Sequence, residues 1–174
     1  MILSLFRRRP KDRGIEPLYG AIMAEGLNPR LYAALGVPDT FEGRFEAVTL
    51  AASVVLHRLK ADPPPADEAA QELVNRLFDG FDSAMREVGI SDVGVPKRMK
   101  KFGQAFYGRL AAYSAAFENA GADALGAALG KNLLEGAPPS PDLLAHVAGY
   151  RRRVLAASLD EILAGRFGEK GNAP

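Results

Sequence analysis

The feature that most constrains the fold of this chain is the spacing of its apolar residues, which recur every three or four positions between breaks of proline and glycine. This spacing places apolar side chains on one face of an α-helix, and the period-2 alternation typical of strands is scarce. Proline breaks a helix in its interior but is accepted in its first turn, so the prolines also mark where helices end and begin. The pattern predicts an all-α protein.

Prolines, glycines and capping residues divide the chain into six or seven expected helices. Their expected ranges are 17–26, 29–35, 41–61, 67–88, 96–120, 125–134 and 141–164. Four of them carry clear apolar stripes, and each stripe predicts a buried face. The stripes are Phe45, Val48, Ala52, Val55 and Leu59; Leu73, Leu77, Phe81 and Met85; Met99, Phe102, Phe106, Leu110, Tyr113 and Phe117; and Leu144, Val147, Tyr150, Val154, Leu155, Leu159 and Ile162.

The length of 174 residues suits one domain with a real core, and 48% hydrophobic and 25% charged residues place the chain among globular proteins. We expect a single compact helical domain at 16–165, a flexible basic N-terminal tail at 1–15 and a short C-terminal tail at 166–174. The chain has no cysteine, which excludes disulfides, thiolate metal sites and cysteine nucleophiles.

Motifs for catalysis and metal binding are missing from the pattern. His57 and His146 have no histidine or carboxylate at ligand spacing, and Asp79 and Asp82 have no second acidic pair. The segment from Gly126 to Asn132 departs from a phosphate loop in spacing and in its last residue. We therefore expect no metal, no cofactor and no enzymatic activity.

Basic residues are concentrated in two places. Lys97, Arg98, Lys100, Lys101 and Arg109 follow one another with no acidic residue between Asp92 and Glu118. Together with nearby small residues they could form a surface for an acidic partner, and an ordinary solvated helix face is the alternative. Nucleic acid is the weaker option, because the net charge is only +1.

The second basic cluster is Arg7, Arg8 and Arg9, which follow the apolar start MILSLF. These residues could contact an anionic membrane surface or ribosomal RNA, or could belong to an ordinary flexible start. A secretory signal would place its charge before a longer apolar run, and no run is long enough to span a bilayer. A peripheral membrane-binding or RNA-binding helical module is therefore the alternative function.

The segment FDGFDSAMREVGISDVGVPKRMKKFGQAFYGRLAAY, from Phe78 to Tyr113, resembles the ubiquinol-cytochrome c chaperone family. Three motifs occur in register: R-E-x-G-I-x-D, V-P-K-x-M-K and F-Y-G-R-x-x-A-Y. A weaker resemblance extends from about Leu18 to Leu163. The resemblance implies an all-helical, non-enzymatic assembly factor of the cytochrome bc1 complex, the ubiquinol-cytochrome c reductase of the respiratory chain.

The resemblance also implies partners. Mitochondrial members work with a smaller partner chaperone near the ribosomal tunnel exit, receive newly synthesised cytochrome b and pass it into assembly. The expected client is therefore cytochrome b apoprotein, with the ribosome as a further contact. The basic N-terminal residues add an anionic membrane surface to the expected contacts. We read no mitochondrial targeting region before the domain, so we expect a location in the cytoplasm, at the inner face of the cytoplasmic membrane. The sequence leaves open whether the small partner is required.

The family motif also points to site residues. Arg86, Asp92, Gly94, Pro96 and Phe106 are expected to shape the turn, cap the next helix and fill the core. The remaining motif residues are expected to contact the client across an exposed groove with apolar and basic lining. They are Glu87, Lys97, Lys100, Lys101, Tyr107 and Arg109. Tyr107 lies off the core stripe, where an aromatic residue is a typical interface anchor.

Overall fold

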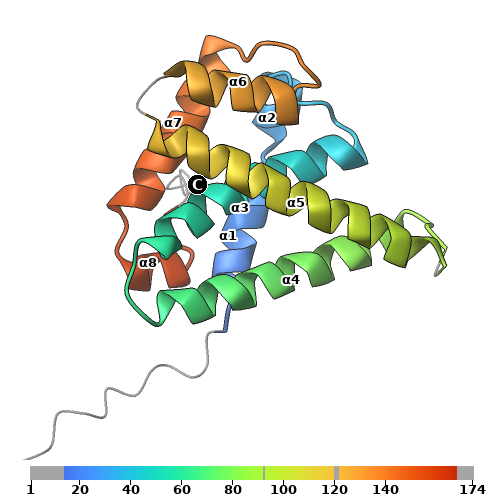
Figure 1. Cartoon of the computed structure of the whole chain (residues 1–174), viewed down its shortest axis with the longest axis horizontal. Coiled ribbons are helices and arrows are strands. Elements are labelled where there is room, and N and C mark those ends of the chain that lie inside the picture. Colours follow the sequence, from blue (N-terminus) through green and yellow to red (C-terminus); the bar gives the residue numbers. More distant parts are fainter. Residues whose placement is uncertain (1–13, 92, 120–121, 168–174) are drawn as a thin grey trace, which may run out of the picture.

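The computed structural model describes residues 14–91, 93–119 and 122–167, and these residues form eight α-helices and no strand (Figure 1). The all-α prediction is confirmed. The helices are α1 (Glu16–Gly26), α2 (Pro29–Ala33), α3 (Phe41–Lys60), α4 (Ala66–Glu87), α5 (Gly94–Glu118), α6 (Ala122–Leu133), α7 (Pro141–Ala156) and α8 (Leu159–Leu163).

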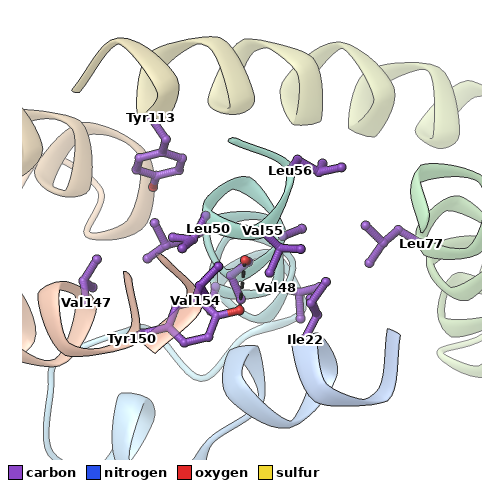
Figure 2. Close-up of a cluster of buried hydrophobic side chains, with 14 of the residues drawn as sticks. Ile22, Val48, Leu50, Val55, Leu56, Leu77, Tyr113, Val147, Tyr150 and Val154 are labelled. Carbon is purple, nitrogen blue, oxygen red and sulfur yellow. Dashed lines mark hydrogen bonds between the residues drawn. The ribbon is translucent and has the colours of Figure 1, made fainter. Parts of the chain in front are cut away.

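Helix α3 lies at the centre, and α1, α4, α5, α6 and α7 all contact it. Every residue from Ala47 to Leu56 is buried, and Figure 2 shows side chains of the surrounding helices converging on this segment. The apolar stripe predicted only one buried face. The helix is instead buried around its circumference, because small residues occupy the positions between the large apolar ones. The hydroxyl of buried Ser53 is satisfied within the helix, donating to the Thr49 carbonyl oxygen at 2.7 Å.

The last helix was predicted as one continuous segment from 141 to 164, and that prediction is wrong. Ala157 is extended, with φ −75° and ψ 142°, so α7 ends there. Ser158 then starts α8 with a capping box, in which its hydroxyl accepts from the Glu161 amide and the Glu161 carboxylate accepts from the Ser158 amide. Leu155, which the stripe predicted to be buried, is 45% exposed, because it lies within α7 about 100° around the helix from buried Val154.

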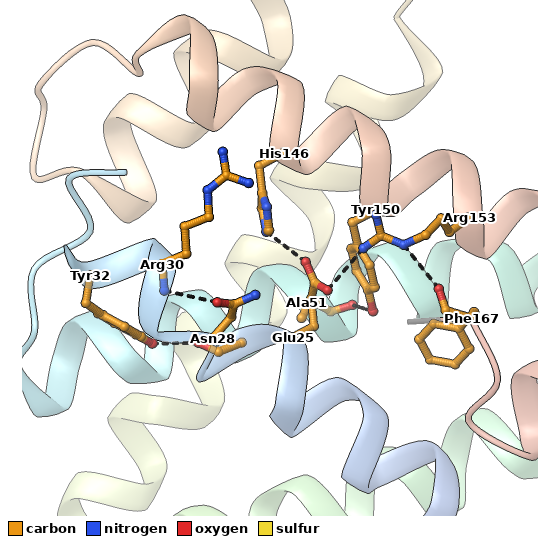
Figure 3. Close-up of polar contacts among 10 residues, drawn as sticks. Glu25, Asn28, Arg30, Tyr32, Ala51, His146, Tyr150, Arg153 and Phe167 are labelled. Atoms are coloured by element: carbon orange, nitrogen blue, oxygen red, sulfur yellow. Dashed lines mark hydrogen bonds and ion pairs between the residues drawn. The ribbon is translucent and has the colours of Figure 1, made fainter. Parts of the chain in front are cut away.

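A polar cluster joins α1 to α7 and to the segment after α8 (Figure 3). The Glu25 carboxylate on α1 lies 2.8 Å from Nε2 of His146 and 3.3 Å from Nη2 of Arg153, both on α7. Arg153 also donates to the carbonyl oxygen of Phe167, whose ring is buried beside Tyr150. His146 therefore lies at the interface between α1 and α7, and ordered packing continues to residue 167.

The closest approach of α1 to α3 depends on a glycine. A Cβ added to Gly26 would lie 2.6 Å from Cα of Val48, closer than real Cβ atoms come to other backbone. A Cβ added to Gly20, on the same helix, would meet nothing within 4 Å. The two glycines therefore form a matched pair, one at a contact and one in open solvent.

We expect Gly26→Ala to lower the free energy of unfolding by about 1–3 kcal/mol, because α1 must shift away from α3. Gly20→Ala should raise it by about 0.5–1 kcal/mol, because alanine favours the helix more than glycine does. Urea denaturation of both variants measures the two effects. Equal effects of the two substitutions would show that the α1–α3 contact does not limit packing.

Candidate protein-binding surface

The resemblance segment forms α4, the following loop and α5, and the two helices converge at that loop, at the right of Figure 1. Gly89 has a φ of +83°, which residues with a side chain rarely adopt. Its amide donates to the Arg86 carbonyl oxygen and the Ile90 amide donates to that of Met85, so α4 ends in a Schellman motif. The predicted turn between the helices is thus built by a left-handed glycine.

The start of α5 differs in detail from the prediction. The helix begins at Gly94, two residues before Pro96, and its N-cap position is Val93, which makes no side-chain capping hydrogen bond. The amides of Gly94 and Val95 donate instead to the Ser91 carbonyl oxygen. Pro96 has no amide hydrogen and lies in the first turn, as expected. Asp92, the expected cap, lies outside the described residues.

An aromatic cluster fixes the angle between α3, α4 and α5. Its members stack edge to face at ring-centroid distances from 4.3 to 6.1 Å, a favoured geometry for aromatic pairs. Phe106 is fully buried, as the stripe predicted. The cluster consists of Phe41, Phe45, Phe78, Phe81, Phe102 and Phe106.

Tyr107 extends this cluster to the surface. Its ring stacks on Phe78 of α4 at 6.2 Å with an interplanar angle of 25°, and the residue is 56% exposed. The Phe78 ring passes close to Gly103, one turn earlier on α5, and would lie in ordinary van der Waals contact, 3.5 Å away, with an added Cβ. One side of the Tyr107 ring thus packs on Phe78, while more than half of the residue is exposed to solvent.

Exposed lysines precede Tyr107 on α5. Lys97, Lys100 and Lys101 are all exposed, and Lys100 lies seven residues before Tyr107, on the same side of the helix. Gly108 beside them has nothing within 4 Å of its Cβ position, so the surface there is low and open. We define the α5 face as Lys97, Lys100, Lys101, Tyr107 and Gly108.

Arg109 does not belong to the α5 face. It lies about 200° around the helix from Tyr107 and points to α3. Its Nε and Nη2 donate to the two carboxylate oxygens of Glu46 at 3.0 and 2.9 Å, a bidentate ion pair in which the side chains are 31% and 15% exposed. The structure therefore separates two residues that the motif suggested would act together.

Burial and hydrogen bonding shift the pKa values of this ion pair. Desolvation raises the pKa of Glu46 above its ordinary value, and the hydrogen bonds from Arg109 partly lower it again. The same contacts raise the pKa of Arg109. Desolvation also raises the pKa of the neighbouring buried Tyr113, whose hydroxyl has no hydrogen-bond partner among the described residues. Arg109 thus serves as an anchor between α3 and α5.

The other predicted site residues occupy the α4–α5 junction or lie outside the described part of the chain. Arg86 pairs with Asp82 at 2.7 Å, and Glu87 is exposed at the end of α4. Gly94 packs closely, since an added Cβ would lie 3.2 Å from Cγ2 of Ile90. Arg7, Arg8 and Arg9 lie outside the described residues.

Neither of the two most prominent cavities among the described residues is the expected groove. The larger, of about 640 Å³, lies between α6 and the loop after it, lined by Lys131, Glu135 and small residues. The smaller, of about 250 Å³, lies between Arg30 and α7. Neither cavity is lined by residues of the α5 face. No group of three or more potential metal ligands occurs among the described residues, and no helix there is long and apolar enough to cross a bilayer.

Comparison with known proteins agrees with this architecture. The sequence model of the ubiquinol-cytochrome C chaperone family matches residues 33–167. The chain belongs to this family. It is also similar to a solved protein, the Cbp3 homolog from Brucella abortus, with 39% sequence identity over 97% of this chain and 96% of that chain and a TM-score of 0.79. No match was found among curated protein sequences. The match includes all of α3 to α8, and so the whole candidate surface of the chaperone.

The Glu46–Arg109 pair predicts a specific pH dependence of stability. Because folding raises the pKa of Glu46, this group contributes stability below its unfolded pKa and loses it as the pH rises through the folded pKa. The advantage of the natural protein over Glu46→Gln should therefore shrink between about pH 4 and pH 7. Urea unfolding at both pH values measures it, with Glu72→Gln, an exposed carboxylate on α4, as the control. An advantage that grows with pH would show that attraction to Arg109 outweighs desolvation.

Proposed function

We propose that this chaperone binds newly synthesised cytochrome b through the α5 face and supports assembly of the cytochrome bc1 complex. Membership of the ubiquinol-cytochrome C chaperone family supports a role in the assembly of the cytochrome bc1 complex. The single observation that supports this choice of binding surface is the exposure of Tyr107, an aromatic residue that stacks on Phe78 and lies within the family motif. A chaperone of this kind acts by holding its client, which requires no catalytic residue.

The stacking of Tyr107 favours binding. Aromatic residues dominate binding energy at interfaces, and a ring already held in its binding conformation loses little conformational entropy when a partner arrives. Packing against Phe78 provides this preorganisation, and the open surface at Gly108 lets a client backbone approach the ring. The face is thus suited to a short apolar segment lying across α5.

The lysines of the α5 face would make the binding of client segments selective. Lys97, Lys100 and Lys101 are exposed on the α5 face. Exposed charges of this kind change the rate of association and the choice of partner more than the final affinity. They would favour client segments in which apolar residues lie next to acidic ones.

The test is capture of cytochrome b made in a cell-free translation system containing the purified chaperone. We expect Tyr107→Ala to reduce the captured fraction with an apparent affinity loss of about 30-fold, the effect of removing a central aromatic anchor. Leu155→Ala is the matched control, because Leu155 is also a large exposed apolar residue, at 45%, but lies on α7. Lys100→Gln with Lys101→Gln should slow capture and reduce its salt dependence.

Two results would contradict this assignment. Capture that survives Tyr107→Ala but fails in Leu155→Ala would place the client on α7. Capture that is unchanged in every variant, with folding verified by circular dichroism, would remove the α5 face from client binding and leave Tyr107 as part of the fold.

A further inference from the structure

The loop between α4 and α5 exposes apolar side chains at the end of the molecule. Val93 is 90% exposed and Val88 is 60% exposed, the two most exposed large apolar residues that the structure describes. The loop lies where α4 and α5 converge, at the right-hand end of the view in Figure 1. Neither valine belongs to the core or to the α5 face defined above, and the fold gives no reason for their exposure.

Exposed cations follow Val93 closely along the chain. Lys97 and Arg98 are in the first turns of α5, four and five residues after Val93, and both are exposed. Residues 86 to 101 contain five basic residues and only two acidic ones. The ion pairs described in this region join Arg86 to Asp82 and Arg109 to Glu46, so neither engages Lys97 or Arg98. We call Val88, Val93, Lys97 and Arg98 the hairpin tip.

We propose that the hairpin tip docks on the surface of an anionic lipid bilayer, with Val88 and Val93 entering the headgroup region and Lys97 and Arg98 contacting lipid phosphates. Apolar side chains at a projecting end with cations set one turn behind match the two layers of such a surface, apolar inside and anionic outside. The hairpin tip shares Lys97 with the α5 face, but its apolar residues are distinct from the aromatic anchor of that face, since Tyr107 lies about 21 Å along the helix from Val93.

A bilayer fits the tip better than nucleic acid does. A phosphate backbone would engage Lys97 and Arg98 but would leave both valines in water, and base stacking needs aromatic rings. The aromatic residues of α4 and α5 point elsewhere: Phe106 is buried, and Tyr107 stacks on Phe78. The backbone amides of the first α5 turn are also occupied, since those of Gly94 and Val95 donate to Ser91. A partner of the hairpin tip is therefore recognised by side chains and not by these backbone amides.

The first test is cosedimentation of the full chain with vesicles of phosphatidylglycerol and phosphatidylcholine, compared with phosphatidylcholine alone. We expect binding only to the anionic vesicles. Lys97→Gln with Arg98→Gln should weaken it about 25-fold, because each cation near an anionic surface contributes about fivefold. Val88→Ser with Val93→Ser should weaken it about tenfold. The control Lys60→Gln with Arg152→Gln removes two exposed charges from α3 and α7 and should retain more binding than the tip variant.

The second test locates the contact directly. Because the chain has no cysteine, Val93→Cys can be labelled at one position with an environment-sensitive fluorophore. Its emission should shift to the blue on anionic vesicles and be quenched by lipids that carry a quencher in the headgroup region. Leu155→Cys, at an exposed residue of α7, should show neither change.

Several outcomes would overturn the proposal. Tip variants that bind vesicles as well as the natural chain, together with loss of binding in an Arg7→Gln, Arg8→Gln and Arg9→Gln variant, would assign the contact to the N-terminal tail. Tip variants that lose RNA binding while keeping vesicle binding would assign the tip to nucleic acid. The Val88→Ser and Val93→Ser variant should still capture cytochrome b, so failure at the tip is distinguishable from failure of the α5 face.

Discussion

The burial of α3 on all sides is the constraint on which the rest of the structure depends. A helix covered around its circumference needs neighbours that approach closely, and this explains the small residues along it and the glycine of α1 that lies against Val48. Each surrounding helix then has one side toward α3 and one side toward solvent. The available surface for binding is therefore the outer side of the surrounding helices.

The aromatic cluster connects this core to the candidate surface. Phe45 on α3 packs against Phe81 of α4 and Phe102 of α5, which sets the angle between the two arms. The Phe78 ring supports the exposed ring of Tyr107 by stacking against it. On the opposite side of α5, Arg109 forms an ion pair with Glu46 of α3. Because both flanks of the helix are fixed, its outer face is presented as a rigid surface. The projecting loop at the end of the two arms is held by the left-handed Gly89.

Helical periodicity predicted much of this architecture because it depends on local chemistry. The stripe of α4, Leu73, Leu77, Phe81 and Met85, is buried in full. Capping residues such as Thr40 and Ser140 begin their helices as expected. The break before α8 also had a local signal, the serine and glutamate of the capping box at 158 and 161, but the continuous apolar stripe concealed it.

Contacts between distant helices could not be predicted in this way. Periodicity shows that a helix has a buried face but carries no information about its partner, so it could not pair Glu46 with Arg109 or Glu25 with His146 and Arg153. The family motif assigned Arg109 to client contact, whereas the structure gives that side chain a partner on α3. Phe78 lay off the expected stripe of α4, and only the tertiary structure reveals it as the support of Tyr107.

The measurement that tests the account most directly is site-specific photo-crosslinking in growing cells from a probe at position 107, with a matched probe at exposed position 68 near the start of α4. The account predicts a crosslink to cytochrome b from position 107 and none from position 68. Crosslinks from position 107 only to lipid or ribosomal components, or equal crosslinks to cytochrome b from both positions, would contradict it.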